Sequence, residues 1–286
     1  MAQLKKIPKL NMRASKHSKK VGFLGPKGTF SHQAILKIFT QKTQCVKAET
    51  ITEIFEKVNS QEIDIGIAPI ENTIGGIVSE TINCLINYPV KVSGSFNMEI
   101  HQCLLARTKD KVDIKIIKSH PQALSQCKNW LTNNLPHAKT ETTASTTAPI
   151  LNTTDKTVGF IASEIAGKVY GLNILAKNIE TTTNNLTKFY LILPDIDKLL
   201  QKKLGAAKTL ILLAVYDRVG VLRDILNVFV KNNINLTALH SIPSLLRQWD
   251  YFFFLEIDTP YPSTQTKIIL QQLEQYCSMV RVLGIS

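Results

Sequence analysis

The stretch EIDIGIAPIENTIGGI, residues 62–77, changes character halfway along. Residues 63–70 form an almost wholly apolar run, as expected of a strand that is buried on both faces. A carboxylate, a carboxamide and a hydroxyl follow at once, at Glu71, Asn72 and Thr73, and a pair of glycines comes shortly after them. A buried strand that ends in polar side chains and a flexible turn indicates a ligand site at its carboxyl end.

The same pattern of strand, polar turn and helix recurs between residues 21 and 193. Ser31 and Ser163 are plausible N-caps, Pro121 suits a first helical turn, and Gly171 suits a helix end. Four such units predict an α/β domain with parallel strands. The strands are expected at 21–24, 63–70, 112–118 and 158–162, and the helices at 31–39, 78–85, 119–131 and 163–170.

The predicted strands end in polar residues that would share one edge of the sheet. Helix N-termini gather at that edge, where unpaired N–H groups and positive dipole ends favour a carboxylate or a phosphate. The glycines in GPKGTFS (25–31) fit neither the GxxxxGK[ST] loop nor the GxGxxG loop. The sequence therefore predicts an anion site without a standard nucleotide motif.

The bulk composition is that of a soluble globular protein of two domains. The chain has 286 residues, 44% of them hydrophobic and 20% charged. No apolar run approaches the ~18 residues of a membrane span. The five cysteines lack CxxC spacing, which favours reduced thiols and a cytoplasmic location. His101 and Cys103 are two residues apart, but no second pair completes a metal site.

The net charge of +12 is concentrated at the start of the chain. Residues 1–20 hold seven Lys and Arg residues and no acid, so they supply more than half of the net charge. They contain no apolar core of a secretory signal and no aromatic residue that could stack on bases. A disordered, solvated tail is therefore favoured over a nucleic-acid-binding arm.

A second block follows a joint at 193–208, a segment that mixes proline, glycine and charges. Strands are expected at 209–216, 236–242, 249–257 and 279–283, with helices at 219–232 and 265–276. The inward residues of the first helix are expected to be Leu222, Ile225, Leu226, Phe229 and Val230. The order βαββαβ is the ferredoxin-like arrangement, which hosts many functions.

Several phrases now make a resemblance visible. Five motifs of the first block resemble those of the prephenate dehydratase family in order and spacing: LGPKGTFSHQA (24–34), PIENTIGG (69–76), SHPQALSQC (119–127), ASTTA (144–148) and NNLTKF (184–189). The second block resembles the ACT regulatory domain through DRVGVL (217–222) and HSIPS (240–244). The resemblance implies a basic tail at 1–20, a catalytic domain at 21–196 and an ACT domain at 205–286. It also implies a two-lobed, type 2 periplasmic-binding-like catalytic fold, whose chain crosses between the lobes near 96–105 and 179–183.

The resemblance implies a carbon–oxygen lyase that converts prephenate to phenylpyruvate, with no cofactor and no metal. Thr187 matches the family's essential threonine, and Glu71 and Gln126 would have supporting roles. An ionised Glu71 would repel a dianion, and Gln126 lies one and a half turns after His120, so it is expected to face elsewhere. The expected substrate contacts are Thr29, Ser31, Asn72, Thr73, His120, Ser145, Asn185, Lys188 and Phe189.

Taken alone, several of these residues have simpler interpretations. Thr187 and Phe189 suit the interior of a strand, and Asn184 and Asn185 suit a turn. The hydroxyls of Thr29, Ser31 and Thr73 and the imidazole of His120 suit helix caps. Lys188 stands where the family usually has arginine, so it keeps the charge but loses the planar fork that binds a carboxylate. Direct contact with the substrate and a structural ion pair both remain open for Lys188.

In the second block the resemblance implies an effector site for phenylalanine at Gly220, Val221, Leu222 and Ser241, and a homodimer or homotetramer. His240 and Ile242 replace the family's glutamate and arginine, so weakened or altered inhibition is expected. Arogenate dehydratase is the nearest alternative function, and a non-catalytic amino-acid- or solute-binding protein is the alternative of another class. No nucleic-acid or membrane partner is expected.

Overall fold

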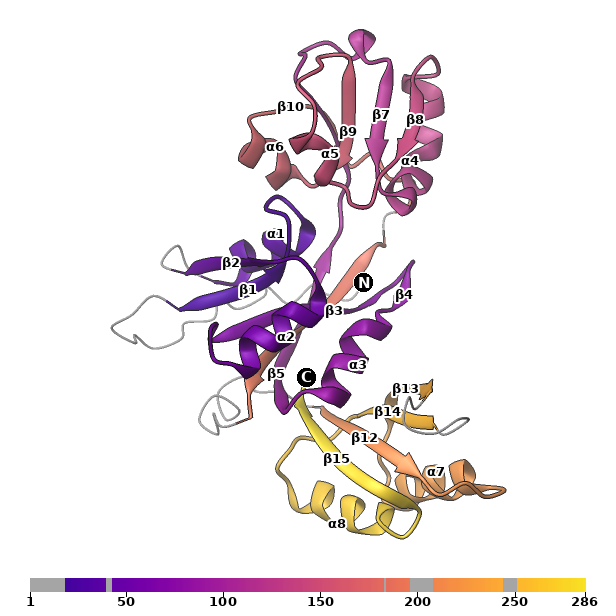
Figure 1. The fold of residues 1–286 in the computed structure, drawn as a ribbon. Coiled ribbons are helices and arrows are strands. Elements are labelled where there is room, and N and C mark those ends of the chain that lie inside the picture. Colours follow the sequence, from indigo (N-terminus) through magenta and orange to yellow (C-terminus); the bar gives the residue numbers. More distant parts are fainter. Residues whose placement is uncertain (1–18, 40–42, 183, 196–207, 244–250) are drawn as a thin grey trace. The chain divides into compact units, whose positions relative to one another are not determined.

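The computed structural model describes residues 19–39, 43–182, 184–195, 208–243 and 251–286, and these residues form two compact units (Figure 1). The first unit holds the described residues of Met1–Ile54, Ile67–Val78 and Asn97–Phe189. The second holds Phe55–Gly66, Ser79–Phe96 and the described residues of Tyr190–Ser286. The boundary divides a helix, α2 (Ile51–Asn59), and three strands, β3 (Ile65–Asn72), β5 (Val90–Glu99) and β11 (Leu186–Pro194).

The first unit begins with a strand, a helix and a parallel strand. β1 (Lys20–Leu24) leads into α1 (Phe30–Ile38), and β2 (Gln44–Ala48) pairs in parallel with β1. β3 (Ile65–Asn72) is the neighbour of β1 and forms a short hairpin with β4 (Gly76–Ile77). The predicted strand at 63–70 is thus displaced by two residues, and Asn72 is its last residue. β2 and the following helix α2 (Ile51–Asn59) were not predicted.

A five-stranded sheet, in the order β10-β6-β9-β7-β8, completes the first unit. Its strands are β6 (Cys103–Ala106), β7 (Ile116–Ser119), β8 (Lys139–Thr142), β9 (Val158–Ala162) and β10 (Asn173–Lys177). β7 is parallel to β9, as predicted, and also to β8, whereas β6 is antiparallel to β9 and β10. β8 and β10 were not predicted. β6 enters this sheet directly from β5 with no crossover helix, which leaves it free to run against its neighbours.

The helices of this sheet begin and end largely at the predicted signals. His120 caps α4 (Pro121–Asn134), Ser163 caps α6 (Glu164–Tyr170), and Gly171 ends α6 at a φ of 64°. A short helix, α5 (Ala148–Leu151), was not predicted. The predicted strand at 112–118 is shorter than expected, because Asp110 caps a 3₁₀ turn, η1 (Lys111–Asp113), before β7 begins.

The second unit contains the predicted βαββαβ order. It comprises α3 (Ser79–Asn87), β12 (Thr209–Val215), α7 (Val221–Lys231), β13 (Leu236–Pro243), β14 (Tyr251–Ile257), α8 (Thr264–Leu273) and β15 (Cys277–Ile285). The strand order β13-β14-β12-β15 confirms the ferredoxin-like arrangement. Residues 1–18, 196–207 and 249–250 of the predicted tail, joint and strand lie outside the described residues.

The inward face of α7 confirms Ile225 and Phe229 of the prediction, but Leu222 and Leu226 are only half-buried. Val230 was expected inside, but its exposed fraction is 74%, and Val228 is buried instead. Ile225, Val228 and Phe229 follow the i, i+3, i+4 spacing of one helix face and pack against Ile211 and Leu255. Val230 lies on a different face of the helix, so its apolar character alone led to the wrong prediction that it faces the core.

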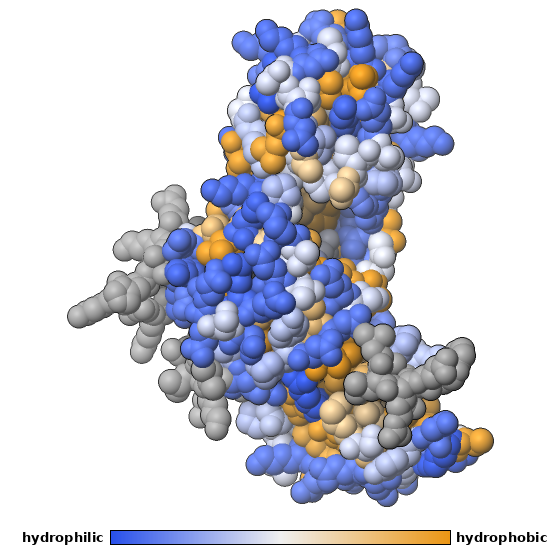
Figure 2. Space-filling model, in the orientation of Figure 1, coloured by the Kyte–Doolittle hydropathy of each residue, from blue (hydrophilic) through white to orange (hydrophobic). Residues whose placement is uncertain are grey.

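The surface and the core fit the bulk composition. Figure 2 shows a face dominated by hydrophilic residues with smaller apolar areas between them. Among the described residues, no helix combines the length and the apolar character needed to cross a membrane. The five cysteines are free thiols, four of them buried.

Candidate functional site

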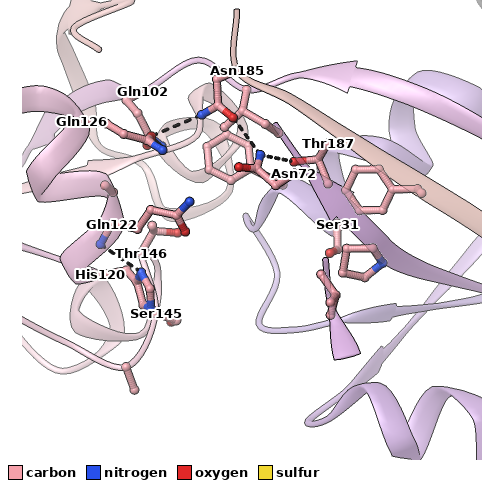
Figure 3. A pocket seen from close by; sticks show the side chains of 17 residues that line it. Ser31, Asn72, Gln102, His120, Gln122, Gln126, Ser145, Thr146, Asn185 and Thr187 are labelled. Atoms are coloured by element: carbon pink, nitrogen blue, oxygen red, sulfur yellow. Dashed lines mark hydrogen bonds between the residues drawn. The ribbon is translucent and has the colours of Figure 1, made fainter. Parts of the chain in front are cut away.

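A cavity of about 310 Å³ lies within the first unit and collects many of the predicted site residues (Figure 3). This volume is at the lower end of the range for small-molecule sites. Its walls come from α1, β3, α4, β11 and the loop before α5. The lining residues are Phe30, Ser31, Pro69, Asn72, Val78, Ile100, Gln102, His120, Gln122, Ala123, Gln126, Ala144, Ser145, Thr146, Asn185, Thr187 and Phe189.

Asn72 is held in one orientation at the end of β3. Its Oδ1 accepts the backbone N–H groups of Ile74 and Gly75, at 3.0 and 2.8 Å. Its Nδ2 must therefore serve as the donor, and it bonds Asn185 Oδ1 at 2.7 Å, Thr187 Oγ1 at 2.9 Å and the carbonyl of Leu186 at 3.1 Å. The sequence places the polar turn directly after a buried strand, and the turn's backbone fixes the amide.

Thr187 lies in the wall of the cavity, with an exposed fraction of 9%. Its oxygen accepts a hydrogen bond from Asn72, and no acceptor for its own proton occurs among the described residues. Asn185, Thr187 and Phe189 alternate along β11 and all line the cavity, while Lys188 does not. The predicted contact of Lys188 with the substrate is therefore not supported by its place on the opposite face of the strand.

The other wall of the cavity carries helix N-termini and hydroxyls. His120 Nδ1 accepts the backbone N–H of Gln122 at 3.3 Å, which leaves Nε2 as the protonated nitrogen of a neutral ring. Ser145 Oγ accepts the N–H of Ala148 at 2.9 Å. Ser31 is buried in the first turn of α1, so its prediction as the N-cap was wrong, because Thr29 caps this helix. The simpler interpretation of His120 as a cap is thus correct, and it coexists with a place in the cavity wall.

Besides Lys188, three other predicted residues lie outside the cavity. Thr29 is the N-cap of α1, where it accepts the N–H of His32 at 3.3 Å and donates to the carbonyl of Leu24 at 2.9 Å. Thr73 donates to the carbonyl of Asn184 at 2.8 Å and accepts the N–H of Leu186 at 3.0 Å, so it joins two turns. Glu71 is exposed and precedes Asn72 on β3, so its side chain leaves the opposite face of the strand.

The prediction that the side chain of Gln126 faces away from the site was wrong. Gln126 lines the cavity, and its Oε1 accepts Nδ2 of Asn185 at 3.2 Å and Nε2 of Gln102 at 3.4 Å. The count from His120 was misleading, because His120 is a cap outside the helix. Gln122 and Gln126, four residues apart, share one helix face. Gln102 and Thr146 also line the cavity, and neither was selected from the sequence.

The described residues around the cavity include no lysine, arginine, aspartate or glutamate. Amides, hydroxyls and the N-termini of α1 and α4 supply its polar surface. Such groups hold an anion through hydrogen bonds and helix dipoles. Across the described residues, no group of three or more His, Cys, Asp or Glu side chains is arranged to hold a metal ion.

In the βαββαβ region, Gly220 has a φ of 81° and precedes α7, followed by Val221 and Leu222 in the first turn. His240 and Ile242 pair with Phe254 and Phe252 of β14, and they share the sheet face opposite α7 and α8. The His240 ring lies 6.2 Å from that of Phe254, and Ile242 is buried. Ser241, between them, is exposed.

The comparisons with known proteins agree with this arrangement. The family described as "Prephenate dehydratase" matches residues 21–196, and the "ACT domain" matches residues 209–260. The chain is 36% identical to the bifunctional chorismate mutase/prephenate dehydratase of Aquifex aeolicus, over 93% of this chain and 72% of that protein. It is 30% identical to arogenate dehydratase 2 of Petunia hybrida, over 96% of this chain and 73% of that protein.

A solved structure gives the same result for the fold. The prephenate dehydratase of Arthrobacter aurescens, crystallised with L-Phe, has a TM-score of 0.83 at 27% identity and covers 93% of this chain and 89% of its own. The two-lobed, periplasmic-binding-like architecture expected from the sequence is thereby confirmed. Because the family match spans more than half of its length, this chain belongs to the prephenate dehydratase family, and an ACT domain follows the dehydratase domain in the sequence.

Proposed function

We propose that this protein catalyses the decarboxylating dehydration of prephenate to phenylpyruvate, in the synthesis of L-phenylalanine. The carbon–carboxylate bond at ring carbon 1 breaks, and its electron pair moves through the ring as CO2 leaves. The carbon–oxygen bond at ring carbon 4 breaks, and the departing hydroxyl takes one proton to become water. Aromatisation drives the reaction, so the protein must hold a dianion and assist the leaving hydroxyl.

The observation that carries the proposal is the polarity of the Asn72–Thr187 hydrogen bond. Because Asn72 donates to Thr187 Oγ1, the threonine proton is left for a group inside the cavity. The hydroxyl of a residue that is only 9% exposed, and that already accepts one hydrogen bond, is a stronger donor than a hydroxyl in bulk water. Thr187 is thus placed to donate to the departing oxygen.

The rest of the cavity suits a dianion that must be held without being neutralised. Hydrogen-bond donors are supplied by the N-termini of α1 and α4 and by the side chains of Ser31, His120 and Ser145. Glu71, whose charge would oppose the substrate, lies on the opposite face of β3. The substrate contacts proposed for Asn72 and Asn185 are supported by their places in the cavity wall, and Glu71 keeps its proposed supporting role.

The test is phenylpyruvate formation from prephenate by the purified full chain. We expect turnover by the wild type and a fall in kcat of about 10²- to 10⁴-fold in Thr187→Ala, with partial recovery in Thr187→Ser. Thr140→Ala, at an exposed position of β8, is the matched control and should leave kcat unchanged. A wild type that binds prephenate without product would instead support a binding protein, and equal rates in all variants would refute the role of Thr187.

Arogenate dehydration is the second candidate, because the same bonds break in a substrate that carries an amino acid side chain in place of the keto acid. The 30% identity to arogenate dehydratase 2 of Petunia hybrida supports it. Turnover of both substrates by the same preparation separates the two functions.

Regulation and assembly complete the proposal. L-Phenylalanine is the proposed effector of the ACT domain, with contacts at Gly220, Val221, Leu222 and Ser241, and the proposed assembly is a homodimer or homotetramer. The structure with L-Phe from Arthrobacter aurescens supports the choice of ligand. Domain limits at 21–196 and 205–286 and a cytoplasmic location stay predictions, to be checked by limited proteolysis and by fractionation.

A further inference from the structure

Four side-chain amides form one hydrogen-bonded relay along the cavity, contributed by Asn72, Asn185, Gln126 and Gln102. An amide presents an oxygen that only accepts and a nitrogen that only donates, so each member constrains the orientation of the next. The relay is anchored at one end by the backbone, where Ile74 and Gly75 bond Asn72 Oδ1. Its polarity is therefore set from outside the side chains.

The polarity passes from one amide to the next without ambiguity. Asn72 donates to Asn185 Oδ1, so the nitrogen of Asn185 faces onward and donates to Gln126 Oε1. Gln102 donates to the same oxygen of Gln126. A reversal of Gln126 would place its nitrogen against two donors, which the relay forbids. Gln126 Oε1 is thus fully used by its neighbours.

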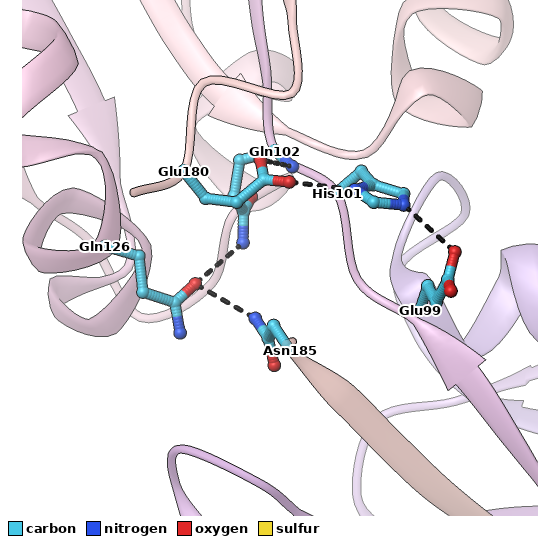
Figure 4. Close-up of polar contacts among 6 residues, drawn as sticks. All are labelled: Glu99, His101, Gln102, Gln126, Glu180 and Asn185. Carbon is cyan, nitrogen blue, oxygen red and sulfur yellow. Dashed lines mark hydrogen bonds and ion pairs between the residues drawn. The ribbon is translucent and has the colours of Figure 1, made fainter. Parts of the chain in front are cut away.

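Gln126 Nε2 is the open end of the relay. No acceptor for it occurs among the described residues, and Figure 4 shows the nitrogen turned away from Gln102 and Asn185. The residue lines the cavity, so its N–H groups are available to a bound molecule. The relay therefore begins at Thr187, through Asn72, and ends in a second donor at Gln126.

The backbone around Gln126 is also hydrogen-bonded. The carbonyl of Gln126 accepts the N–H of Thr181 at 2.9 Å, and the carbonyl of Asn185 accepts the N–H of Ile100 at 2.9 Å. Glu180, with 4% of its side chain exposed, accepts the backbone N–H of Gln102 at 2.8 Å. These bonds preorganise the amide, which is the condition for a group that discriminates between ligands.

We propose that Gln126 is a specificity-determining residue, whose Nε2 donates to the keto oxygen of the substrate side chain and so selects a keto acid over the corresponding amino acid. The inference rests on the proposed function and names the substrate class of the same site. A keto oxygen accepts a hydrogen bond from an amide nitrogen. An ammonium group in its place would meet a second donor, and both would lose their partners.

The chemistry of the two substrates makes this donor discriminating. Prephenate and arogenate share both carboxylates and the ring hydroxyl, and they differ only where a carbonyl is replaced by a protonated amine. Thr187 and Asn72 serve groups that the substrates share, so they raise the rate on both. Only a group that faces the point of difference changes the ratio of the two rates.

The experiment compares kcat/KM on prephenate and on arogenate for the full chain and its variants. The wild type should prefer prephenate. In Gln126→Glu, a carboxylate oxygen still accepts from Asn185 while the other oxygen faces the cavity, so the prephenate/arogenate ratio should fall by at least about tenfold. Gln126→Met removes the donor without adding charge, and its ratio should fall by about threefold or more.

Gln122→Glu is the matched control, since Gln122 lies on the same face of α4 and lines the same cavity. It adds the same charge without ending the relay, so its ratio should change by less than about threefold. An equal shift in Gln122→Glu and Gln126→Glu would reduce the effect to general charge and overturn the proposal. Equal losses on both substrates in Gln126→Met, or a wild type that prefers arogenate, would also overturn it.

The proposed function and this inference fail in different ways. A wild type that turns over neither substrate refutes the function itself, before any variant is compared. A wild type that turns over prephenate, with an unchanged ratio in Gln126→Met, refutes only the role of Gln126. Circular dichroism of each variant verifies that the fold is retained, and Gln126→Met keeps the test decisive if Gln126→Glu does not fold.

Discussion

Asn72 Nδ2 lies 2.9 Å from Thr187 Oγ1 and donates to it, although the two residues are separated by 115 positions in the chain. The direction of this bond follows from two backbone N–H groups that occupy the other end of the amide. A residue from the PIENT turn thus decides where the proton of Thr187, the proposed catalytic residue, points. The relationship makes the function of Asn72 testable apart from that of Thr187.

Asn72→Asp should abolish this arrangement while keeping the shape of the side chain. A carboxylate still accepts the N–H groups of Ile74 and Gly75, but its second oxygen competes for the Thr187 proton. We expect kcat on prephenate to fall by about 10²- to 10³-fold, comparable to the loss of one preorganised donor. Steady-state kinetics with Asn184→Asp, an exposed neighbour, provides the control. Near-wild-type turnover in Asn72→Asp would contradict this reading of the bond.

The sequence predicted the parts of the site that follow from local patterns. A buried run followed by the polar residues Glu71, Asn72 and Thr73, a cap at His120 and a strand around Thr187 are all visible in the residue order. The ferredoxin-like order and both helices of the ACT region were visible for the same reason. Strand ends and caps are local properties, so one chain suffices to find them.

What the sequence did not reveal depends on contacts between distant segments. Gln102 has no periodic or motif signal, and it matters only because Gln126 and Asn185 meet it in space. Thr29 and Thr73 looked equivalent to Ser31 and Asn72, but bonds to their own turns remove them from the cavity. The displacement of β3 by two residues likewise depends on its hairpin with β4.

His101 gives the stability of the protein a dependence on pH. Its Nδ1 lies 2.8 Å from Glu180 and its Nε2 lies 3.3 Å from Glu99. The hydrogen bond with Glu180 does most to raise the pKa of His101. Burial opposes it, and the weaker hydrogen bond with Glu99 adds to the rise. The folded state therefore binds the imidazole proton more tightly than the unfolded state does.

The sign of the effect follows from this difference. Protonated His101 stabilises the folded state. This contribution to the free energy of unfolding is fully present below the unfolded pKa of about 6.5 and is lost as the pH rises through the higher pKa of the folded state. We expect the free energy of unfolding to decline from about pH 6.5 upward in the wild type, and to decline less in His101→Gln and in Glu180→Gln. Urea unfolding across this range measures it, with exposed His137→Gln as the control. Identical slopes in all four proteins would exclude His101 as the source.

Feedback inhibition by phenylalanine should be weak, because His240 and Ile242 stand where the family's motif has a glutamate and an arginine. Ile242 is buried, and it offers a ligand neither a charge nor a donor. We expect the wild type to need far more phenylalanine for half-inhibition than the double variant His240→Glu/Ile242→Arg. Initial rates on prephenate over a phenylalanine series measure this, and His240→Glu alone is the control. Ordinary tight inhibition of the wild type would refute the prediction.

Gly284 permits the backbone pairing between β15 and β5. It adopts a φ of 139° and is paired in parallel with Val92, and an added Cβ would overlap the backbone of Val92. The same region is joined by Arg281, which donates to the carbonyls of Ile86 and Tyr88 at 2.9 Å each. A side chain at position 284 must therefore separate the two strands or strain the backbone.

Gly284→Ala should accordingly cost about 2–4 kcal/mol of stability, the sum of backbone strain and steric overlap. Gly171→Ala is the control, because Gly171 also has a positive φ, of 64°, but no atom within 4 Å of the added Cβ. It should cost only about 1–2 kcal/mol. Thermal unfolding midpoints rank the variants, and hydrogen exchange locates the damage. Faster exchange should appear in β5 and β15 for Gly284→Ala alone, and equal protection of these strands in both variants would show that the pairing does not depend on Gly284.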